Sequence, residues 1–330
     1  MGMSEHHSNP PRIVSVIIGT RNRPDTLRAA LASIRALEGP DLKFQILVGD
    51  NGTTPETAGV VADFGGIYDR TEKYGCPAAR NLAIRRMTGE FVALLDDDDV
   101  WLPDHIRAHI AMLDANPEMA AVFGQVVFAD DQLKPLPEEE QWKAVAPADG
   151  DVFRMMMSGY FPQVGATVVR GEIARKIGEM DETLIGDSDW DWQLRIARNY
   201  KIGFVDTRCV LFRGRPPGSS DKLQATRVGY TRKIFFRHLP KNLGHWKSPV
   251  SVVRSYFGTV ENYYAYFIAT AKAEVEAGRK GVALRAFWLA FKTFPSRMLR
   301  NTMTDRTVRR ALLRAMRLQR GVAPPGAGAA

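Results

Sequence analysis

Short apolar runs alternate with segments of longer apolar period through the first 215 residues of the chain. Uninterrupted apolar runs are typical of buried strands, and apolar positions spaced by three or four residues are typical of amphipathic helices. We expect strands at residues 14–18, 44–48, near 67, and at 91–95, 120–128, 166–170 and 203–211. We expect helices at residues 24–37, 57–64, from 77 onward, 103–116, near 153, 171–177 and 190–200. This alternation predicts an α/β fold with a mostly parallel central sheet flanked by helices.

The pattern changes beyond residue 215. Residues 213–220 are rich in glycine and proline, which breaks any regular element, and strand patterns then stop. Helices are expected at residues 223–236, 249–276, 280–294 and 296–320. One stripe has helical spacing, and we interpret it as packing within a helical hairpin rather than as a ligand site: Val253, Tyr256, Phe257, Val260, Tyr264 and Phe267.

These patterns divide the chain into four parts. We expect a flexible N-terminus over residues 1–11, an α/β domain over 12–215, a basic helical region over 216–320 and a disordered tail over 321–330. The formal net charge of +8 is distributed unevenly between them. Residues 1–215 carry 24 Lys and Arg against 32 Asp and Glu, whereas residues 216–330 carry 21 against 5. The acidic N-terminal part suits metal and nucleotide chemistry, and the basic C-terminal part suits binding to an anionic surface.

The last expected helix, residues 296–320, is basic and amphipathic. It carries eight arginines and one acid, Asp305. Two interpretations stay open: its apolar face packs on the protein, or the helix lies on anionic lipid. We do not expect nucleic acid as a partner, because no nucleic-acid-binding motif accompanies the arginines. Its apolar face comprises Val308, Ala311, Leu312, Ala315 and Met316.

The sequence lacks the patterns of a membrane span, a signal peptide and a cysteine metal motif. No stretch approaches the ~20 apolar residues of a membrane span, and residues 1–10 are polar. We therefore expect a cytoplasmic protein, peripheral on the inner face of the cell membrane if the basic helix binds lipid. Cys76 and Cys209 are too far apart to suggest a metal motif, so both are expected to be ordinary thiols. A homo-oligomer is possible.

Four consecutive acids, Asp96 to Asp99, directly follow the apolar run at residues 91–95, and we call them the acidic run. Ligands of open α/β sheets bind at the carboxyl ends of strands, where the acidic run lies. Neighbouring carboxylates repel each other unless a cation lies between them, and oxygen ligands favour Mg²⁺ or Mn²⁺. The alternative is a solvated acidic turn, which fits less well with the Trp101 and Pro103 that follow.

Four segments in order resemble the inverting glycosyltransferases of family 2, which have the GT-A fold, a Rossmann-like architecture. The segments are residues 14–23, 46–53, 75–90 and the acidic run. The resemblance implies a nucleoside-diphosphate sugar as donor, with a UDP-sugar as the leading candidate, and Mn²⁺ or Mg²⁺ as cofactor. Together with the basic tail it implies a hydroxyl acceptor on a glycan or lipid-linked sugar in cell-envelope polysaccharide synthesis.

The resemblance also implies donor-binding roles. Asp50 would accept a hydrogen bond from the nucleotide base, in a pocket lined by Thr20, Arg21 and Asn22. Arg21 stands where the family usually has tyrosine, so the base would stack on a guanidinium. Arg80 would approach the diphosphate or the base, unless it forms only an ion pair on a helix surface.

In the acidic run, Asp96 and Asp97 would contact the ribose or metal-bound waters, and Asp98 would bind the metal with Asp96 as a further ligand. Many relatives carry a metal-binding histidine where this chain has arginine. We therefore expect Arg213 or Arg215 to clamp the diphosphate instead.

The family places its catalytic base at an acidic motif that opens a helix ending in arginine, and residues 187–195 resemble that motif. Counting back from the arginine favours Asp189, with Asp187 second, and leaves Asp191 as a structural residue. Three tryptophans could line the acceptor site or pack in the core: Trp101, Trp190 and Trp192.

Two rival functions stay open. Asp96 to Val100 also matches the nucleophile motif of haloacid-dehalogenase-type phosphohydrolases, although that nucleophile belongs on the first strand of its fold. The second rival is a non-catalytic relative that binds a membrane surface and lacks turnover.

Overall fold

The computed structural model describes residues 10–147, 150–214, 221–239, 246 and 248–317. Arg215, most of the expected flexible N-terminus and the tail at 321–330 lie outside the described residues. The chain divides into two compact units. An α/β unit contains Met1–Met156 and Phe161–Asp221, and a helical unit contains Met157–Tyr160 and Lys222–Ala330.

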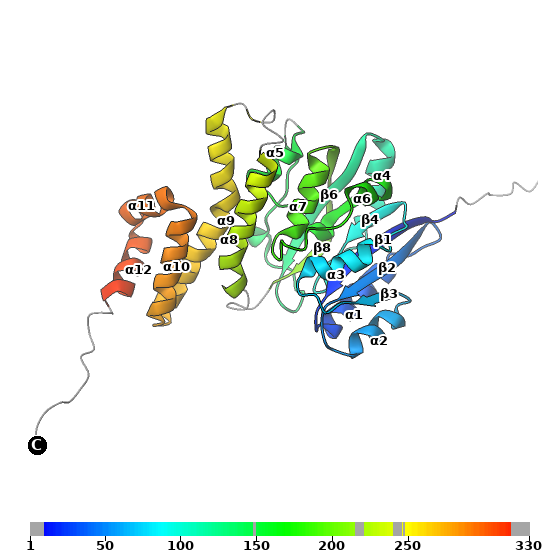
Figure 1. The fold of residues 1–330 in the computed structure, drawn as a ribbon, viewed down its shortest axis with the longest axis horizontal. Coiled ribbons are helices and arrows are strands. Elements are labelled where there is room, and N and C mark those ends of the chain that lie inside the picture. Colours follow the sequence, from blue (N-terminus) through cyan, green and yellow to red (C-terminus); the bar gives the residue numbers. More distant parts are fainter. Residues whose placement is uncertain (1–9, 148–149, 215–220, 240–245, 247, 318–330) are drawn as a thin grey trace, which may run out of the picture. The chain divides into compact units, whose positions relative to one another are not determined.

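The α/β unit is built on one eight-stranded sheet with the order β3-β2-β1-β4-β7-β6-β8-β5 (Figure 1). Its strands are β1 (Arg12–Thr20), β2 (Leu42–Asp50), β3 (Ile67–Arg70), β4 (Phe91–Leu94), β5 (Val100–Trp101), β6 (Met119–Ala129), β7 (Thr167–Arg170) and β8 (Lys201–Arg213). Strands β3, β2, β1 and β4 are parallel neighbours, and β6 is parallel to β8. β7 is antiparallel to β4 and β6, and β5 is antiparallel to β8. The mostly parallel sheet is therefore confirmed.

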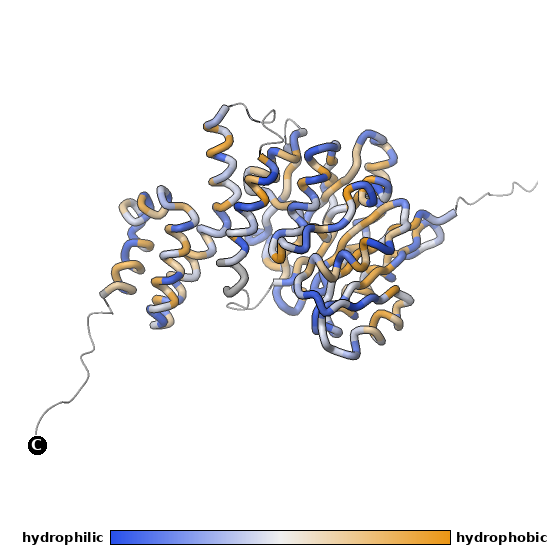
Figure 2. Tube along the Cα trace, in the orientation of Figure 1, coloured by the Kyte–Doolittle hydropathy of each residue, from blue (hydrophilic) through white to orange (hydrophobic). Residues whose placement is uncertain are grey.

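Helices cover both faces of this sheet. They are α1 (Pro24–Arg35), α2 (Glu56–Asp63), α3 (Cys76–Ile84), α4 (His105–Ala115), α5 (Val152–Met156), α6 (Gly171–Ile177) and α7 (Ser188–Ala197). Side chains alternate along β1, so Val16 and Ile18 pack with α1, α2 and α4, whereas Ile17 packs with α3, α6 and α7. Figure 2 shows the resulting concentration of hydrophobic residues along the central strands.

The register of the parallel strands brings three chain segments to one edge of the sheet. Thr20 pairs with Asp50 where β1 and β2 end, and Ile17 pairs with Leu94 where β4 ends. Helix α3 packs close to these ends because Gly49 has no side chain: a Cβ there would lie 1.8 Å from the Ala79 carbonyl oxygen. The acidic run thus leaves the sheet beside the ends of β1 and β2, next to α3.

The helical unit contains α8 (Asp221–His238), α9 (Pro249–Glu276), α10 (Lys280–Thr293), α11 (Pro295–Thr304) and α12 (Arg306–Arg317). Helices α9 and α10 pack as a hairpin, with Tyr264, Phe267 and Phe287 in its core. The stripe on α9 is therefore packing, as expected, although Val253 is exposed. Within the described residues no helix is both long and apolar enough to span a membrane.

The prediction of a single helix at residues 296–320 is wrong, because the helix is interrupted at Asp305. This residue has an extended backbone (ψ 107°), and its carboxylate accepts hydrogen bonds from the backbone N–H groups of Thr307 and Val308 at 2.8 and 3.2 Å. It therefore ends α11 and caps α12. The apolar face of α12 is used for packing, since Val308 and Ala315 are buried in the core of the helical unit.

Candidate active site

Three carboxylates of the acidic run converge after β4. Asp96, Asp98 and Asp99 each place an oxygen atom within 4.8 Å of the others. Such an all-oxygen set fits Mg²⁺ or Mn²⁺, which share carboxylate ligands and keep bound water. The side chains of Asp96 and Asp98, the expected ligands, are 29% and 13% exposed. They can therefore reach an ion at the surface.

Asp99 joins this group, although its sequence position alone predicted no role for it. It is 1% exposed, and its oxygens accept hydrogen bonds from the Arg213 backbone N–H (2.8 Å) and from Gln163 Nε2 (3.1 Å). Gln163 precedes the short 3₁₀ helix Val164–Ala166. Asp99 thus joins the acidic run to the end of β8 and to this helix. Apart from its place in the run, nothing in the sequence marked that contact.

Asp97 points into the protein. It is 5% exposed, accepts a hydrogen bond from Thr20 Oγ1 at 2.7 Å, and pairs with Arg23 at 3.0 Å. Burial raises the pKa of Asp97 to about 6, although the Arg23 charge opposes the shift. Arg23, another residue without an assigned role, also pairs with Asp98 at 2.8 Å. The turn after β1 is therefore fastened to the acidic run.

Arg80 links the acidic run to helix α7. Its side chain is only 3% exposed, and its guanidinium pairs with Asp96 and, at 3.5 Å, with Asp189. A charged group this buried needs such partners. The next residue holds the segment that precedes α7: Asn81 donates to the Met180 carbonyl oxygen at 3.0 Å and accepts from the Met180 N–H at 2.8 Å.

The three acids at the start of α7 have different surroundings. Asp191 is 1% exposed and lies 3.3 Å from Arg195, which fits a structural role. Asp187 is 8% exposed and has a left-handed backbone (φ 59°). The Asp189 side chain is 29% exposed and accepts a hydrogen bond from the Trp190 N–H. Asp189 is thus the most accessible of the three.

The expected base pocket lies where β1 and β2 end. Asp50 is fully buried, and its oxygens accept hydrogen bonds from the Gly52 N–H (2.6 Å) and the Tyr68 hydroxyl (2.9 Å). Burial and the Asp50 carboxylate raise the pKa of Tyr68 to about 12. Any contact of Asp50 with a base would add to these two bonds. The guanidinium of Arg21 lies over the ring of Tyr74.

Asn22 and Arg213 form side-chain hydrogen bonds to backbone groups of neighbouring segments. Asn22 has a left-handed conformation (φ 56°), and its side-chain oxygen accepts from the Thr53 N–H at 2.6 Å and the Thr54 N–H at 3.1 Å. Arg213 donates to the carbonyl oxygens of Asp98 (2.7 Å) and Asp131 (2.6 Å). Both residues therefore shape the site through the backbone, and their contact with a donor stays a prediction.

The three tryptophans considered for the acceptor site are core residues. Trp101, Trp190 and Trp192 are 4%, 3% and 1% exposed. Trp101 donates to the Gly165 carbonyl oxygen at 2.8 Å, and Trp192 donates to the Gly178 carbonyl oxygen at 2.9 Å. None of the three offers its face to a sugar, so the packing alternative holds.

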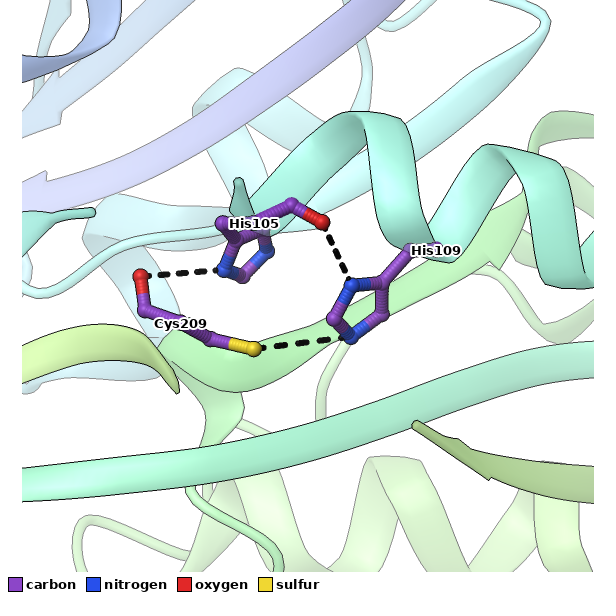
Figure 3. A group of neighbouring side chains, drawn as sticks. All are labelled: His105, His109 and Cys209. Carbon is purple, nitrogen blue, oxygen red and sulfur yellow. Dashed lines mark hydrogen bonds between the residues drawn. The ribbon is translucent and has the colours of Figure 1, made fainter. Parts of the chain in front are cut away.

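A second polar cluster, His105, His109 and Cys209, lies in the core between α4 and β8 (Figure 3). The two imidazole rings are stacked, with centroids 4.6 Å apart and planes 11° apart. Rings stacked in parallel planes cannot direct lone pairs at one ion. Both nitrogens of His109 also lie near carbonyl oxygens, those of His105 (2.7 Å) and Ala166 (3.1 Å). We interpret the cluster as packing, so the metal site is expected at the acidic run alone among the described residues.

Comparison with known proteins agrees with this geometry. Residues 15–176 match the model of the family described as Glycosyl transferase family 2. The uncharacterized glycosyltransferase MJ1057 of Methanocaldococcus jannaschii is 26% identical over 255 residues, 71% of this chain and 84% of that protein. The UDP-Glc:alpha-D-GlcNAc-diphosphoundecaprenol beta-1,3-glucosyltransferase WfgD of Escherichia coli is 31% identical over 105 residues, 31% of this chain and 41% of that protein.

Among solved structures, residues 1–349 of S. aureus TarS in complex with UDP-GlcNAc superpose with a TM-score of 0.58 at 16% identity. The match covers 93% of this chain and 88% of that one, and it supports the fold. The family match also excludes the phosphohydrolase alternative, in agreement with the position of the acidic run after β4 rather than β1. The protein is a glycosyltransferase with the GT-A fold, and its α/β unit carries a glycosyl transferase family 2 domain at residues 15–176.

Proposed function

We propose that the protein transfers a sugar, with inversion at the anomeric carbon, from a UDP-sugar to a hydroxyl of a glycan or lipid-linked acceptor. The observation that carries this proposal is the position of Arg80, whose one guanidinium contacts both Asp96 and Asp189. The acidic run and a partly exposed carboxylate therefore lie within the span of one side chain. A single displacement needs this proximity, because the leaving group and the base act on opposite sides of one carbon atom.

On the donor side, Asp98 and Asp96 would hold Mg²⁺ or Mn²⁺, which neutralises charge on the departing diphosphate. UDP is the proposed nucleotide, since the names of WfgD and of the TarS complex both include it. Arg21 and Tyr74 would support the base, and Thr20 and Asn22 would shape its pocket.

On the acceptor side, Asp189 is the proposed general base, and Asp187 is the second candidate. Asp189 is the more exposed of the two, and its contact with Arg80 orients the carboxylate. A base must reach the acceptor hydroxyl, so accessibility favours Asp189. Arg80 would act as a positioning residue between the donor and acceptor sides.

For the acceptor we propose a lipid-linked sugar at the cytoplasmic face of the cell membrane, in envelope polysaccharide assembly. The exposed arginines of α12 support a membrane surface: Arg306, Arg309, Arg310 and Arg314. Exposed apolar side chains lie among them or on the preceding helix, namely Leu299, Met303, Leu313 and Met316. Cationic and apolar side chains together favour an anionic lipid surface. The WfgD name, which includes a diphosphoundecaprenol-linked sugar, points to the same acceptor class.

The decisive experiment measures donor binding and transfer with the full chain. UDP-glucose, UDP-GlcNAc and GDP-mannose are titrated by calorimetry with and without Mn²⁺, and released nucleotide is measured with GlcNAc-diphosphoundecaprenol as acceptor. We expect Mn²⁺-dependent binding of a UDP-sugar and acceptor-dependent release of UDP. Absence of Mn²⁺-dependent binding by every nucleotide sugar would instead support the non-catalytic relative.

A further inference from the structure

A cavity of about 280 Å³ lies in the α/β unit, away from the acidic run. Strands β6 and β8 form its floor, and the proline-rich segment from Pro135 to Lys143, including the 3₁₀ helix Glu138–Glu140, forms its wall. None of the residues that line it belongs to the acidic run, the base pocket or the start of α7. Nothing in the proposed donor chemistry accounts for this cavity.

The wall is fixed by two glutamine side chains that pair with backbone groups as a strand would. Gln125 donates to the Ala144 carbonyl oxygen at 2.9 Å and accepts from the Ala144 N–H at 2.8 Å. Gln141 donates to the Phe128 carbonyl oxygen at 2.9 Å and accepts from the Phe128 N–H at 2.7 Å. The segment is therefore held along β6 at two points, and the cavity is preformed.

The lining combines one accessible aromatic ring with polar groups. Trp142 is 53% exposed, in contrast to the three tryptophans buried in the core of the same unit. Asp206 accepts a hydrogen bond from Gln125 at 2.7 Å and has a second oxygen. An indole face that packs against C–H groups, beside planar hydrogen-bonding groups, is a combination that suits a sugar ring.

Charge and size narrow the ligand further. The two cations at the cavity, Lys143 and Arg208, both pair with Glu138, at 2.7 and 3.1 Å. With Asp206 as the second carboxylate of the lining, two negative charges balance the two positive charges, which disfavours a phosphate or other strong anion. The volume is just below the 300–1,000 Å³ range of pockets for drug-sized ligands, so it suits one ring rather than a nucleotide.

The cavity lies upstream of the active site along two strands. β6 continues for two residues beyond the cavity residue Val127 to its end at Ala129, and β8 continues for five residues beyond Arg208 to its end at Arg213. The Arg213 N–H donates to Asp99. At about 3.3 Å per residue these spans are roughly 7 to 17 Å. A short oligosaccharide whose end lies at the acidic run can cover this distance.

We propose that this cavity is a carbohydrate subsite that binds one neutral pyranose ring, stacked on Trp142. Its assignment to a distal sugar of the acceptor glycan depends on the proposed function, whereas sugar binding itself does not. The bound ring would add affinity for longer acceptors without contacting the reacting atoms.

The test is saturation-transfer NMR on the full chain with the methyl glycosides of glucose, galactose, mannose and N-acetylglucosamine. We expect at least one to bind at millimolar concentration, Trp142→Ala to weaken it at least tenfold, and Trp142→Phe to retain it. Trp288→Ala is the matched control, because Trp288 is 58% exposed but belongs to the helical unit. No binding by any glycoside, or binding that Trp142→Ala leaves unchanged, overturns the proposal.

Transfer assays then test the link to the acceptor. Trp142→Ala should raise the KM for a long acceptor several-fold while the KM for the donor and the rate with a monosaccharide acceptor stay unchanged. An unchanged KM for the long acceptor refutes the assignment to the acceptor glycan. If no sugar transfer is detected at all, the proposed function fails, and the glycoside titrations still decide whether the cavity binds a sugar.

Discussion

The guanidinium of Arg21 lies 4.8 Å from the centroid of the Tyr74 ring, in cation–π contact. Tyr74 is 56% exposed, so the pair lies at the surface of the expected base pocket. Where the resemblance to the family implies a tyrosine, this chain has Arg21, and its guanidinium rests on a tyrosine from another segment. We expect the pair to offer a flat surface on which a nucleobase can stack.

This relationship predicts graded losses of donor affinity. Arg21→Ala should weaken UDP binding about tenfold, because stacking on a base contributes about 1–3 kcal/mol. Tyr74→Ala should cost about threefold, since it removes only the support of the guanidinium, worth about 0.5–1 kcal/mol. Calorimetry with UDP measures both. Tyr200→Ala, which disrupts the distant Lys176–Tyr200 cation–π pair, is the control. Equal UDP affinity in all three variants would exclude a stacking role for Arg21.

The sequence predicted the sheet and the position of the acidic run because strands buried on both faces appear as short uninterrupted apolar runs that can be read directly. It did not predict the contacts of Arg23 or Gln163 with the acids, since these join residues far apart in the chain. The sequence left the tryptophans open between the acceptor site and the core for a similar reason. A large aromatic ring packs inward or outward according to its tertiary neighbours, which composition does not record. The break at Asp305 was missed because its capping role depends on backbone geometry.

The base assignment predicts a separation of binding from turnover. Asp189→Asn should lower kcat between about a hundredfold and ten-thousandfold, the usual contribution of a general base. UDP affinity should change less than twofold. Asp187→Asn is the matched control, because asparagine tolerates the left-handed backbone at this position. Rates of nucleotide release at saturating donor provide the measurement. If Asp187→Asn loses turnover and Asp189→Asn does not, the base is Asp187.

Mn²⁺-dependent binding of the donor should require Asp98. Asp98→Ala removes a partly exposed carboxylate of the acidic group and should reduce Mn²⁺-dependent donor binding at least a hundredfold. Chelation with EDTA should have the same effect on the unmodified protein. Asp104→Ala removes a nearby carboxylate that is exposed and outside the acidic group, and it should leave binding unchanged. Calorimetric titration of UDP with Mn²⁺ distinguishes them, and retained Mn²⁺ dependence in Asp98→Ala would contradict the assignment.

The buried histidines predict acid sensitivity of the fold. Burial lowers the pKa of His109 from 6.5 to about 4. Between these two values the unfolded chain binds a proton that the folded protein does not, so stability falls as the pH falls through this window. Above pH 6.5 the effect is absent, and below about pH 4 it no longer grows. From pH 7 to pH 5, His109 should cost about 2 kcal/mol of unfolding free energy.

Urea denaturation at pH 7, 6 and 5 measures this effect. His109→Gln is expected to be less stable at every pH, because it changes a fully buried side chain. The informative quantity is the slope with pH, which should become shallower in the variant. The control is Lys43→Gln, which changes an exposed side chain and no histidine. It should leave the slope of stability with pH unchanged. An identical slope in His109→Gln and the unmodified protein would remove His109 as the source.

The exposed arginines of α12 predict that the protein binds anionic vesicles through this helix. Truncation before this helix would remove Val308 and Ala315 from the core, so charge reversal on its exposed face is the cleaner change. Reversal of Arg306, Arg310 and Arg314 to Glu should weaken binding at least a hundredfold, because each basic residue near the surface contributes about 1 kcal/mol.

Flotation with vesicles of phosphatidylglycerol and phosphatidylcholine measures the bound fraction. The control reverses three exposed lysines of the α/β unit, Lys43, Lys134 and Lys201, so that net charge changes equally. If both triple variants lose binding to the same extent, attraction depends on total charge rather than on α12. Loss confined to the α12 variant, and weakened by added salt, is the result expected for a basic face whose field is screened within a Debye length.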